Sequence, residues 1–225
     1  MDLNADFFVR VAMHTEDIPW QASPMKGVDR RMLDRLGGEV ARATTIVRYV
    51  PGSHFSPHVH TGGEEFIVLD GVFQDEHGDF PVGSYVRNPP TSKHKPGSEP
   101  GCTIFVKLWQ FDMEDRIHVN INMNNTVAKA SKDRVGVSTI SLFHDVREHV
   151  HMEMWKPEVS NMIETQGGAE VLVLDGSFSE SGEIFTKHSW LRVPDNYPLH
   201  LVAGKEGAKI WIKTGHLRHV ARPSS

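Results

Sequence analysis

A twelve-residue segment of this chain occurs twice. The first copy, GGEEFIVLDGVF, covers residues 62–73, and the second, GGAEVLVLDGSF, covers residues 167–178. Eight of the twelve positions are identical, and the offset between the copies is 105 residues (167 − 62). Such a repeat in a chain of 225 residues indicates that one folding unit occurs twice in tandem, so the chain should form two similar domains.

Shorter segments repeat at or near the same offset, which extends the similarity over most of each half. The pattern Y-x-R-x-P at 85–89 returns as W-x-R-x-P at 190–194, residues 101–107 resemble 207–213, and residues 9–13 resemble 119–123. Each half therefore begins with an alternating strand. We predict one domain over residues 1–114 and a second over residues 115–225.

The local pattern inside each half is that of short strands separated by turns. Residues 41–50 are rich in β-branched side chains, and residues 66–69 and 103–109 are short apolar runs. Helical periodicity is scarce. The one helix candidate is the segment 29–36, which Gly37 and Gly38 would end, although the same segment could equally be extended. Many short, evenly spaced strands predict a β-sandwich or β-barrel.

Composition excludes several classes of function. The net charge is −5, from 24 basic and 29 acidic residues without a Lys/Arg cluster, so we expect no nucleic-acid partner. The single cysteine, Cys102, excludes an internal disulfide framework and is compatible with a reducing cytoplasm. Acidic residues near the N-terminus are unlike a signal peptide, and no apolar run is long enough to span a membrane. We therefore expect a cytoplasmic protein without a membrane partner.

Three side chains of metal-binding type lie close together in the first half: His58, His60 and Glu64. Successive side chains of a strand point to opposite faces, so His58 and His60 point the same way if the segment is extended. A Thr-Gly-Gly turn at 61–63 follows, after which Glu64 can return a carboxylate to the same side. This spacing predicts a metal site.

The same spacing resembles that of the cupin family. Residues 52–71 match its motif G-x5-H-x-H-x3-E-x6-G at every position. Residues 83–98 match its second motif, G-x5-P-x-G-x2-H-x3-N, in part, because Thr91 and Ser98 replace the second Gly and the Asn. The resemblance implies an all-β chain of two tandem jelly-roll barrels, a bicupin. It also implies four metal ligands, which are His58, His60, Glu64 and His94.

The second half lacks these ligands. At the offset of 105 residues the four positions carry Ile163, Thr165, Ala169 and Leu199. We therefore predict a metal-binding barrel over residues 1–114 and a degenerate barrel over residues 115–225. The spacing of two recurs at His149 and His151, but Trp155 occupies the position of the carboxylate, so we expect this pair to be solvated or to line a cavity.

The ligand types restrict the metal without naming it. Three imidazoles and one carboxylate suit Zn²⁺, Fe²⁺, Mn²⁺ or Ni²⁺. We expect one divalent ion per chain, with Zn²⁺ as the first choice. A tetrahedral Zn²⁺ with four protein ligands would be closed, whereas an octahedral metal would keep two positions for water, oxygen or substrate.

A narrower resemblance covers residues 51–110, which are similar to the cupin domain of ChrR, the zinc-containing anti-sigma factors. In that family the cupin responds to oxidative stress, and a separate N-terminal zinc domain holds the sigma factor. The resemblance implies a sensory or regulatory role in transcription with a sigma-factor regulatory partner. This chain departs from the family because its start is strand-like and it has one cysteine, so its residues do not support direct inhibition of a sigma factor.

A second function stays open. Similar short cupins carry an iron site of three His and one Glu, which implies a metal-dependent dioxygenase that acts on a small diketone or aromatic ketone. The partner would then be a small-molecule ligand. The sequence identifies no catalytic residues, and it leaves open whether the chain is an enzyme and whether it forms a homodimer.

Overall fold

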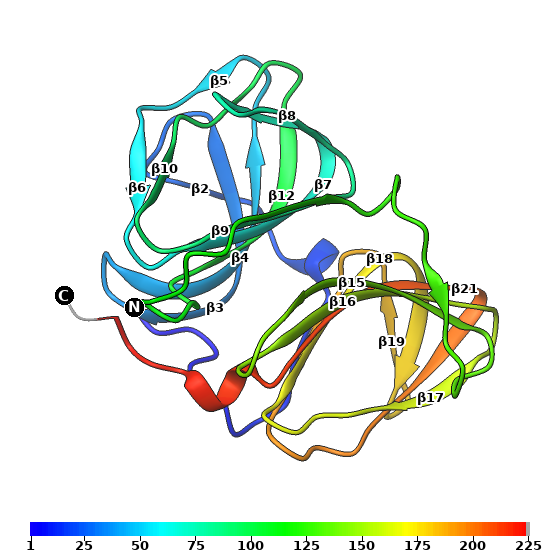
Figure 1. Ribbon diagram of the computed structural model, residues 1–225. Helices are drawn as coiled ribbons and strands as arrows, with labels where there is room; N and C mark the ends of the chain where they lie inside the picture. Colours follow the sequence, from blue (N-terminus) through cyan, green and yellow to red (C-terminus); the bar gives the residue numbers. More distant parts are fainter. Residues whose placement is uncertain (224–225) are drawn as a thin grey trace. The chain divides into compact units, whose positions relative to one another are not determined.

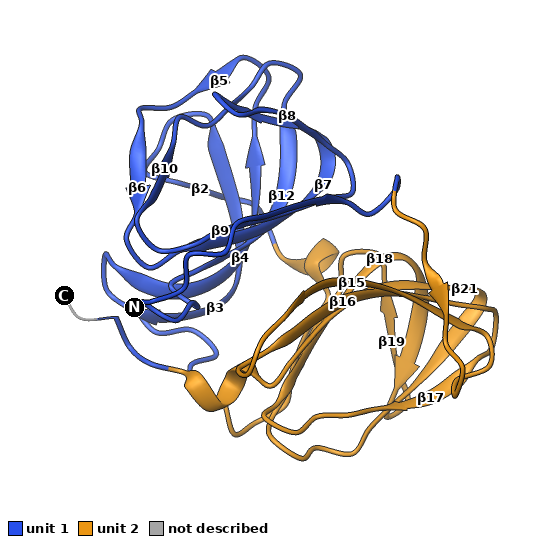
Figure 2. Cartoon of the chain, in the orientation of Figure 1, with its two compact units in different colours: residues 1–5, 19–125, 221–225 blue, residues 6–18, 126–220 orange. Residues whose placement is uncertain are grey.

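The computed structural model describes residues 1–223 and contains two compact units (Figures 1 and 2). Unit 1 comprises residues 1–5, residues 19–125 and the C-terminal end from Ala221, and unit 2 comprises residues 6–18 and 126–220. Each unit is an antiparallel β-barrel. The bicupin fold class predicted from the sequence is therefore confirmed. No helix within residues 1–223 is long and apolar enough to cross a membrane.

Unit 1 contains a large sheet with the strand order β13-β9-β7-β12-β4-β3-β2 and a separate ladder of β10 with β6. Strands β5, β8 and β11 extend the large sheet from its side. The bounds are β2 Gln21–Ala22, β3 Val28–Gly37, β4 Ala41–Tyr49, β5 Ser53–His54, β6 His58–His60, β7 Glu64–Asp75, β8 Gly78–Pro81, β9 Ser84–Asn88, β10 Ser92–His94, β11 Gly97–Ser98, β12 Cys102–Leu108 and β13 Val119–Asn122.

Unit 2 repeats this arrangement with the order β1-β20-β18-β21-β16-β15-β14, in which β17 pairs with β21 and β19 with β18. The bounds are β1 Val11–Met13, β14 Lys129–Ala130, β15 Val137–His144, β16 His149–Trp155, β17 Ser160–Ile163, β18 Ala169–Glu180, β19 Glu183–Thr186, β20 Trp190–Val193 and β21 Leu199–Thr214. Two short 3₁₀ helices, η1 Thr15–Asp17 and η2 His216–His219, are the only helices within residues 1–223.

Of the two conformations that the sequence left open for residues 29–36, helical or extended, the structure shows the extended one, because these residues belong to strand β3. This strand pairs with β4 from Val28 opposite Tyr49 to Gly37 opposite Ala41, with a bulge between Met32 and Asp34. The sequence left the extended form open. The ladder with β4 favours the extended form, because the neighbouring strand satisfies the backbone N–H and C=O groups. In an isolated segment of this length, only a helix would satisfy these groups.

The two halves exchange their first strands. Strand β1 pairs with β20 of unit 2, with Val11 opposite Arg192, and β13 pairs with β9 of unit 1, with Val119 opposite Arg87. Arg10 anchors the first exchanged segment through ion pairs with Glu180 at 2.7 Å and Glu183 at 2.6 Å. The compact units therefore differ from the sequential division into 1–114 and 115–225, because strand pairing is not a local property of the chain.

The paired glycines of the repeat serve close packing in each barrel. A Cβ atom on Gly63 would lie 2.5 Å from the ring of Phe111, and one on Gly168 would lie 2.5 Å from Leu217. Both glycines also have a positive φ, 77° in each case, which a larger residue rarely adopts. Packing therefore explains why the second copy of the repeat retains the Gly-Gly pair although it lacks the metal-ligand residues.

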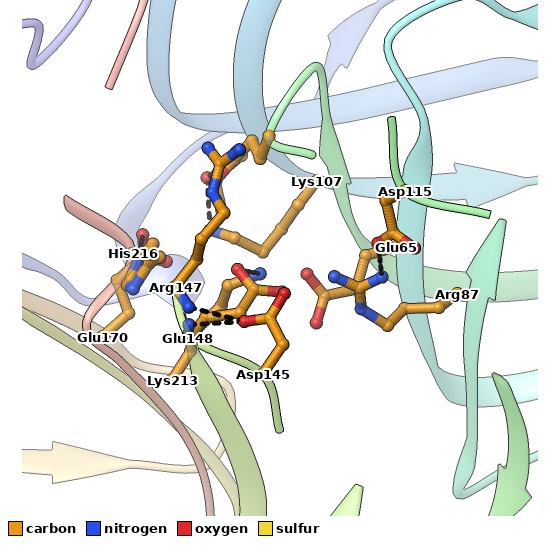
Figure 3. A network of polar contacts seen from close by, with 12 residues as sticks. Glu65, Arg87, Lys107, Asp115, Asp145, Arg147, Glu148, Glu170, Lys213 and His216 are labelled. Atoms are coloured by element: carbon orange, nitrogen blue, oxygen red, sulfur yellow. Dashed lines mark hydrogen bonds and ion pairs between the residues drawn. The ribbon is translucent and has the colours of Figure 1, made fainter. Parts of the chain in front are cut away.

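A buried carboxylate explains another repeated position in unit 1. Glu65 is 1% exposed and accepts a hydrogen bond of 2.7 Å from the hydroxyl group of Tyr85 (Figure 3 shows Glu65). In the sheet it lies opposite Lys107 on one side and Arg87 on the other, and Arg87 pairs with Asp115 at 2.8 Å. A row of opposite charges across three strands therefore balances the buried carboxylate.

Unit 2 builds the same row. Glu170 is fully buried, lies opposite Lys213 and Arg192, and accepts a hydrogen bond of 3.1 Å from Trp190 Nε1. It also contacts His216 Nε2 at 2.8 Å (Figure 3). Because Trp190 replaces Tyr85 as the donor, both barrels preserve the hydrogen bond while the donor residue changes.

We predict that Tyr85→Phe lowers the free energy of unfolding by about 1.5–3 kcal/mol, because it leaves a buried charged acceptor without this donor. Tyr197→Phe is the matched control. Its hydroxyl group contacts Glu180 at 3.1 Å, but Glu180 keeps its ion pair with Arg10, so the loss should be smaller. Urea unfolding of both variants measures the difference, and equal losses would contradict the role of the Glu65 row.

Candidate metal centre

The ladder between β6 and β10 places three histidines together in unit 1. His94 lies directly opposite His58, and Ser92 lies opposite His60. His58 and His60 are two residues apart on one strand, so all three side chains project from one face of the ladder. A tight turn follows, with a hydrogen bond of 3.2 Å from Gly63 N to His60 O, and Glu64 then begins β7.

The functional atoms of the predicted ligands converge. One nitrogen of each histidine lies within 4.8 Å of the others, and the Nε2 atoms of His60 and His94 are 2.9 Å apart. Glu64 Oε2 is 3.3 Å from His60 Nε2 and 3.7 Å from His94 Nε2. His60, His94 and Glu64 are buried, whereas His58 is exposed. The structure thus brings together all four residues that the sequence singled out.

The hydrogen bonds around the cluster show that its donor set fits a cation. His58 Nδ1 faces the carbonyl oxygen of Ser56 at 3.2 Å, and His94 Nδ1 faces Asp75 Oδ2 at 3.1 Å. Both acceptors are satisfied when Nδ1 carries the N–H, which leaves the Nε2 atoms of His58 and His94 available to an ion. Burial opposes protonation of His94, but the hydrogen bond to Asp75 and the charge of Glu64 outweigh it and raise the pKa of His94. Burial lowers the pKa of His60, which disfavours the charged ring. Nitrogen atoms and a carboxylate that face one another in this way form a donor set that fits a cation, and these three histidines can hold a metal ion.

Two residues around this cluster had no signal in the sequence. Asp75, at the end of β7, is 4% exposed in its side chain and fixes the ring of His94. Asn88 Nδ2 donates to Glu64 Oε2 at 3.3 Å and so orients the carboxylate. Both contacts join residues that are far apart in the chain, and neither residue belongs to the spaced motif.

A cavity of about 560 Å³ lies beside the cluster in unit 1. His94, Asp75, Asn88 and Lys93 are among its polar residues, and Phe80 is among its apolar ones. This volume is within the range of small-molecule sites. The cavity therefore provides space for a ligand next to one of the predicted metal ligands.

The counterpart of the cluster in unit 2 is part of the core. Ile163 lies opposite Leu199 in the ladder of β17 with β21, as His58 lies opposite His94. Both residues are buried members of the hydrophobic cluster. The hydroxyl group of Thr165 donates to the carbonyl oxygen of Tyr197 at 2.6 Å. The offset of the repeat therefore identifies the structural equivalents, and these residues carry no metal-ligating groups.

The His149 and His151 pair lines a cavity of about 320 Å³ in unit 2. Their ring centroids are 4.4 Å apart. Burial, together with His151 and His144, lowers the pKa of His149 to about 4, so this imidazole is neutral at pH 7. The sequence left open whether this pair is solvated or lines a cavity, and the structure shows that it lines a cavity.

The fold and the three-histidine cluster define a bicupin with a candidate metal centre in its first barrel. Residues 9–112 match the family described as ChrR Cupin-like domain. This match covers less than half of the chain, and over it the first barrel resembles the ChrR cupin. No curated protein gave a significant match.

Solved structures share the fold at low sequence identity. A putative dioxygenase from Nostoc punctiforme has a TM-score of 0.77 and 16% identity, with 97% of this chain and 87% of that chain covered. A putative glyoxylate induced protein from Pseudomonas aeruginosa has a TM-score of 0.72 and 12% identity, with 96% and 92% covered. A deletion mutant of Bacillus subtilis oxalate decarboxylase has a TM-score of 0.62 and 12% identity, with 95% and 79% covered.

We predict that Glu64→Gln lowers metal affinity far more than Glu65→Gln does. Glu64 points toward the histidines, whereas Glu65 points to the opposite face and accepts the hydrogen bond from Tyr85. Titration of each folded variant with Zn²⁺ measures both affinities. The reverse order would refute the assignment of Glu64 to the metal.

We also predict that Asp75→Asn lowers Zn²⁺ affinity by about 10–100-fold, because the carboxylate sets the tautomer and orientation of His94. Asp79→Asn is the matched control, since the exposed Asp79 only accepts a hydrogen bond of 2.7 Å from Gln74. The same titration tests both variants. An unchanged affinity in Asp75→Asn would show that His94 does not depend on this contact.

Proposed function

We propose that the first barrel binds one divalent metal ion, with Zn²⁺ as the physiological metal and His58, His60, Glu64 and His94 as ligands. The convergence of these side chains is the single observation that carries the proposal. Three imidazole nitrogens and one carboxylate oxygen complete the tetrahedral shell that Zn²⁺ prefers.

The regulatory part of the proposal follows from the family. The match of residues 9–112 to the ChrR Cupin-like domain supports a sensory or regulatory cupin that acts in the response to oxidative stress. In this proposal the protein acts in the cytoplasm, and a regulatory partner connects the metal-loaded barrel to a sigma factor. Loss or rearrangement of the metal would be the event that the partner detects.

An Fe²⁺-dependent dioxygenase is the second candidate, and two observations favour it. His58 is exposed, so the cluster is not closed to solvent, and the cavity of about 560 Å³ beside His94 has room for a small diketone or aromatic ketone. An octahedral Fe²⁺ with four protein ligands keeps two open positions, which Zn²⁺ in a tetrahedral shell does not. Similarity to a putative dioxygenase supports this alternative at the level of the fold.

Metal analysis followed by oxygen uptake separates the two functions. We predict that protein purified without chelators contains about one metal per chain, mainly zinc, and that His58→Ala/His94→Ala loses it. Apoprotein reconstituted anaerobically with Fe²⁺ should then consume no oxygen with a panel of diketones and aromatic ketones, because a regulatory site has no substrate to oxidise. An oxygen electrode measures this directly.

Two outcomes would overturn the proposal. Zinc that co-purifies with the double variant at the wild-type content would refute the ligand assignment. Substrate-dependent oxygen consumption that disappears in His60→Ala would make the protein a dioxygenase, since zinc has no redox chemistry of its own.

A further inference from the structure

The cavity of unit 2 is built on a different strand from the candidate metal centre of unit 1. Its wall includes His149, His151 and Glu153 of β16. These residues precede Trp155 by six, four and two positions, so all project from the same face of the strand. Trp155 belongs to the hydrophobic core of the unit. The two histidines therefore point toward the inside of the second barrel.

The buried carboxylate in this wall is already neutralised. Glu153 is fully buried and accepts hydrogen bonds from both terminal nitrogens of Arg134 and one of 2.7 Å from Trp155 Nε1. Arg134 and Glu153 thus form an ion pair with no net charge. Glu164, which is exposed, adds a carboxylate to the same cavity. The cavity therefore has a net negative charge and favours a cation over an anion.

The imidazoles of His149 and His151 are polar groups of the cavity whose nitrogen atoms are not all hydrogen-bonded. His149 makes no hydrogen bond to another of the residues 1–223, and its contacts are ring contacts with His151 at 4.4 Å and His144 at 5.0 Å. His151 is 8% exposed, and its Nδ1 atom is buried without a hydrogen-bond partner, while Nε2 lies 3.3 Å from Glu153. Buried nitrogen atoms without partners are costly unless a ligand occupies the site.

We infer that this cavity is a second metal site, which takes a transition-metal cation of the Zn²⁺, Ni²⁺ or Cu²⁺ type through His149 and His151. Imidazole nitrogens are the preferred protein ligands of these ions, and two histidines two residues apart on a strand present their rings to one ion. Glu164, which also lines the cavity, supplies a negative charge that offsets part of the charge of the incoming cation.

The two sites are distinct and of unequal strength. The offset of 105 residues places His149 and His151 at Thr44 and Ile46 of the first barrel, so the second site is not a copy of the first. Within residues 1–223, His58, His60 and His94 form the only group of three or more such residues whose ligand atoms lie within 4.8 Å of one another. The site in unit 2 offers two imidazoles, so we expect it to bind more weakly and to fill after the first.

The test is a calorimetric titration of the full chain with Zn²⁺. The variant His58→Ala/His94→Ala, which lacks the first site, should still bind one Zn²⁺ per chain with lower affinity than the wild type. Adding His149→Ala/His151→Ala should abolish this binding. Adding His200→Ala instead should not, because the exposed His200 contacts Ser160 and lies outside the cavity.

A spectroscopic measurement avoids any change in the second barrel. One equivalent of Cu²⁺ added to His58→Ala/His94→Ala should give an electron paramagnetic resonance spectrum with hyperfine coupling to two imidazole nitrogens. Absence of Zn²⁺ binding by this variant would overturn the inference. Loss of binding on removal of His200 equal to the loss on removal of His149 and His151 would also overturn it, because the bound Zn²⁺ would then be an adventitious ion only. If the wild type binds a single ion that only the His149→Ala/His151→Ala change removes, the first-barrel proposal fails while this one stands.

Discussion

The hydrogen bond between Tyr85 and Glu65 fixes the orientation of β7, on which the candidate metal centre depends. Successive side chains of a strand face opposite sides, so burying Glu65 on one face directs Glu64 into the barrel. A slip of one residue in the register would exchange the two carboxylates and remove Glu64 from the histidines. The register of β7 therefore determines both the charged row around Glu65 and the position of Glu64 among the metal ligands.

The two barrels show that this scaffold is independent of the chemistry it carries. Unit 2 retains the buried carboxylate as Glu170 and the close-packed glycine as Gly168, yet hydrophobic core fills the place of the ligand cluster. The equivalent of Asp75 is Glu180, which binds Arg10 of the exchanged segment instead of a histidine. A carboxylate at the end of the long strand thus orients a ligand in one barrel and anchors a strand in the other.

The exposure of its side chains bears on both proposed uses of the first-barrel cluster. Three of its side chains are buried, which strengthens electrostatic interactions with an ion and limits competition from water. His58 is exposed, so an ion held there would remain accessible to a partner or a small molecule. Both proposed functions need this access, and they differ in whether the metal keeps open coordination positions.

The sequence by itself determined the parts of this protein that depend on local spacing. Two histidines two residues apart must share a face of a strand, and the doubled glycine and glutamate motif required two similar barrels. It could not decide the conformation of residues 29–36, which only the ladder with β4 makes a strand. Only the tertiary structure could show that β1 and β13 are exchanged, that Asp75 holds His94, and that His149 and His151 line a cavity. These features join residues that are distant in the chain. Such pairs form because a buried polar group must find its partners within the folded protein, and local sequence does not record which residues the fold brings together.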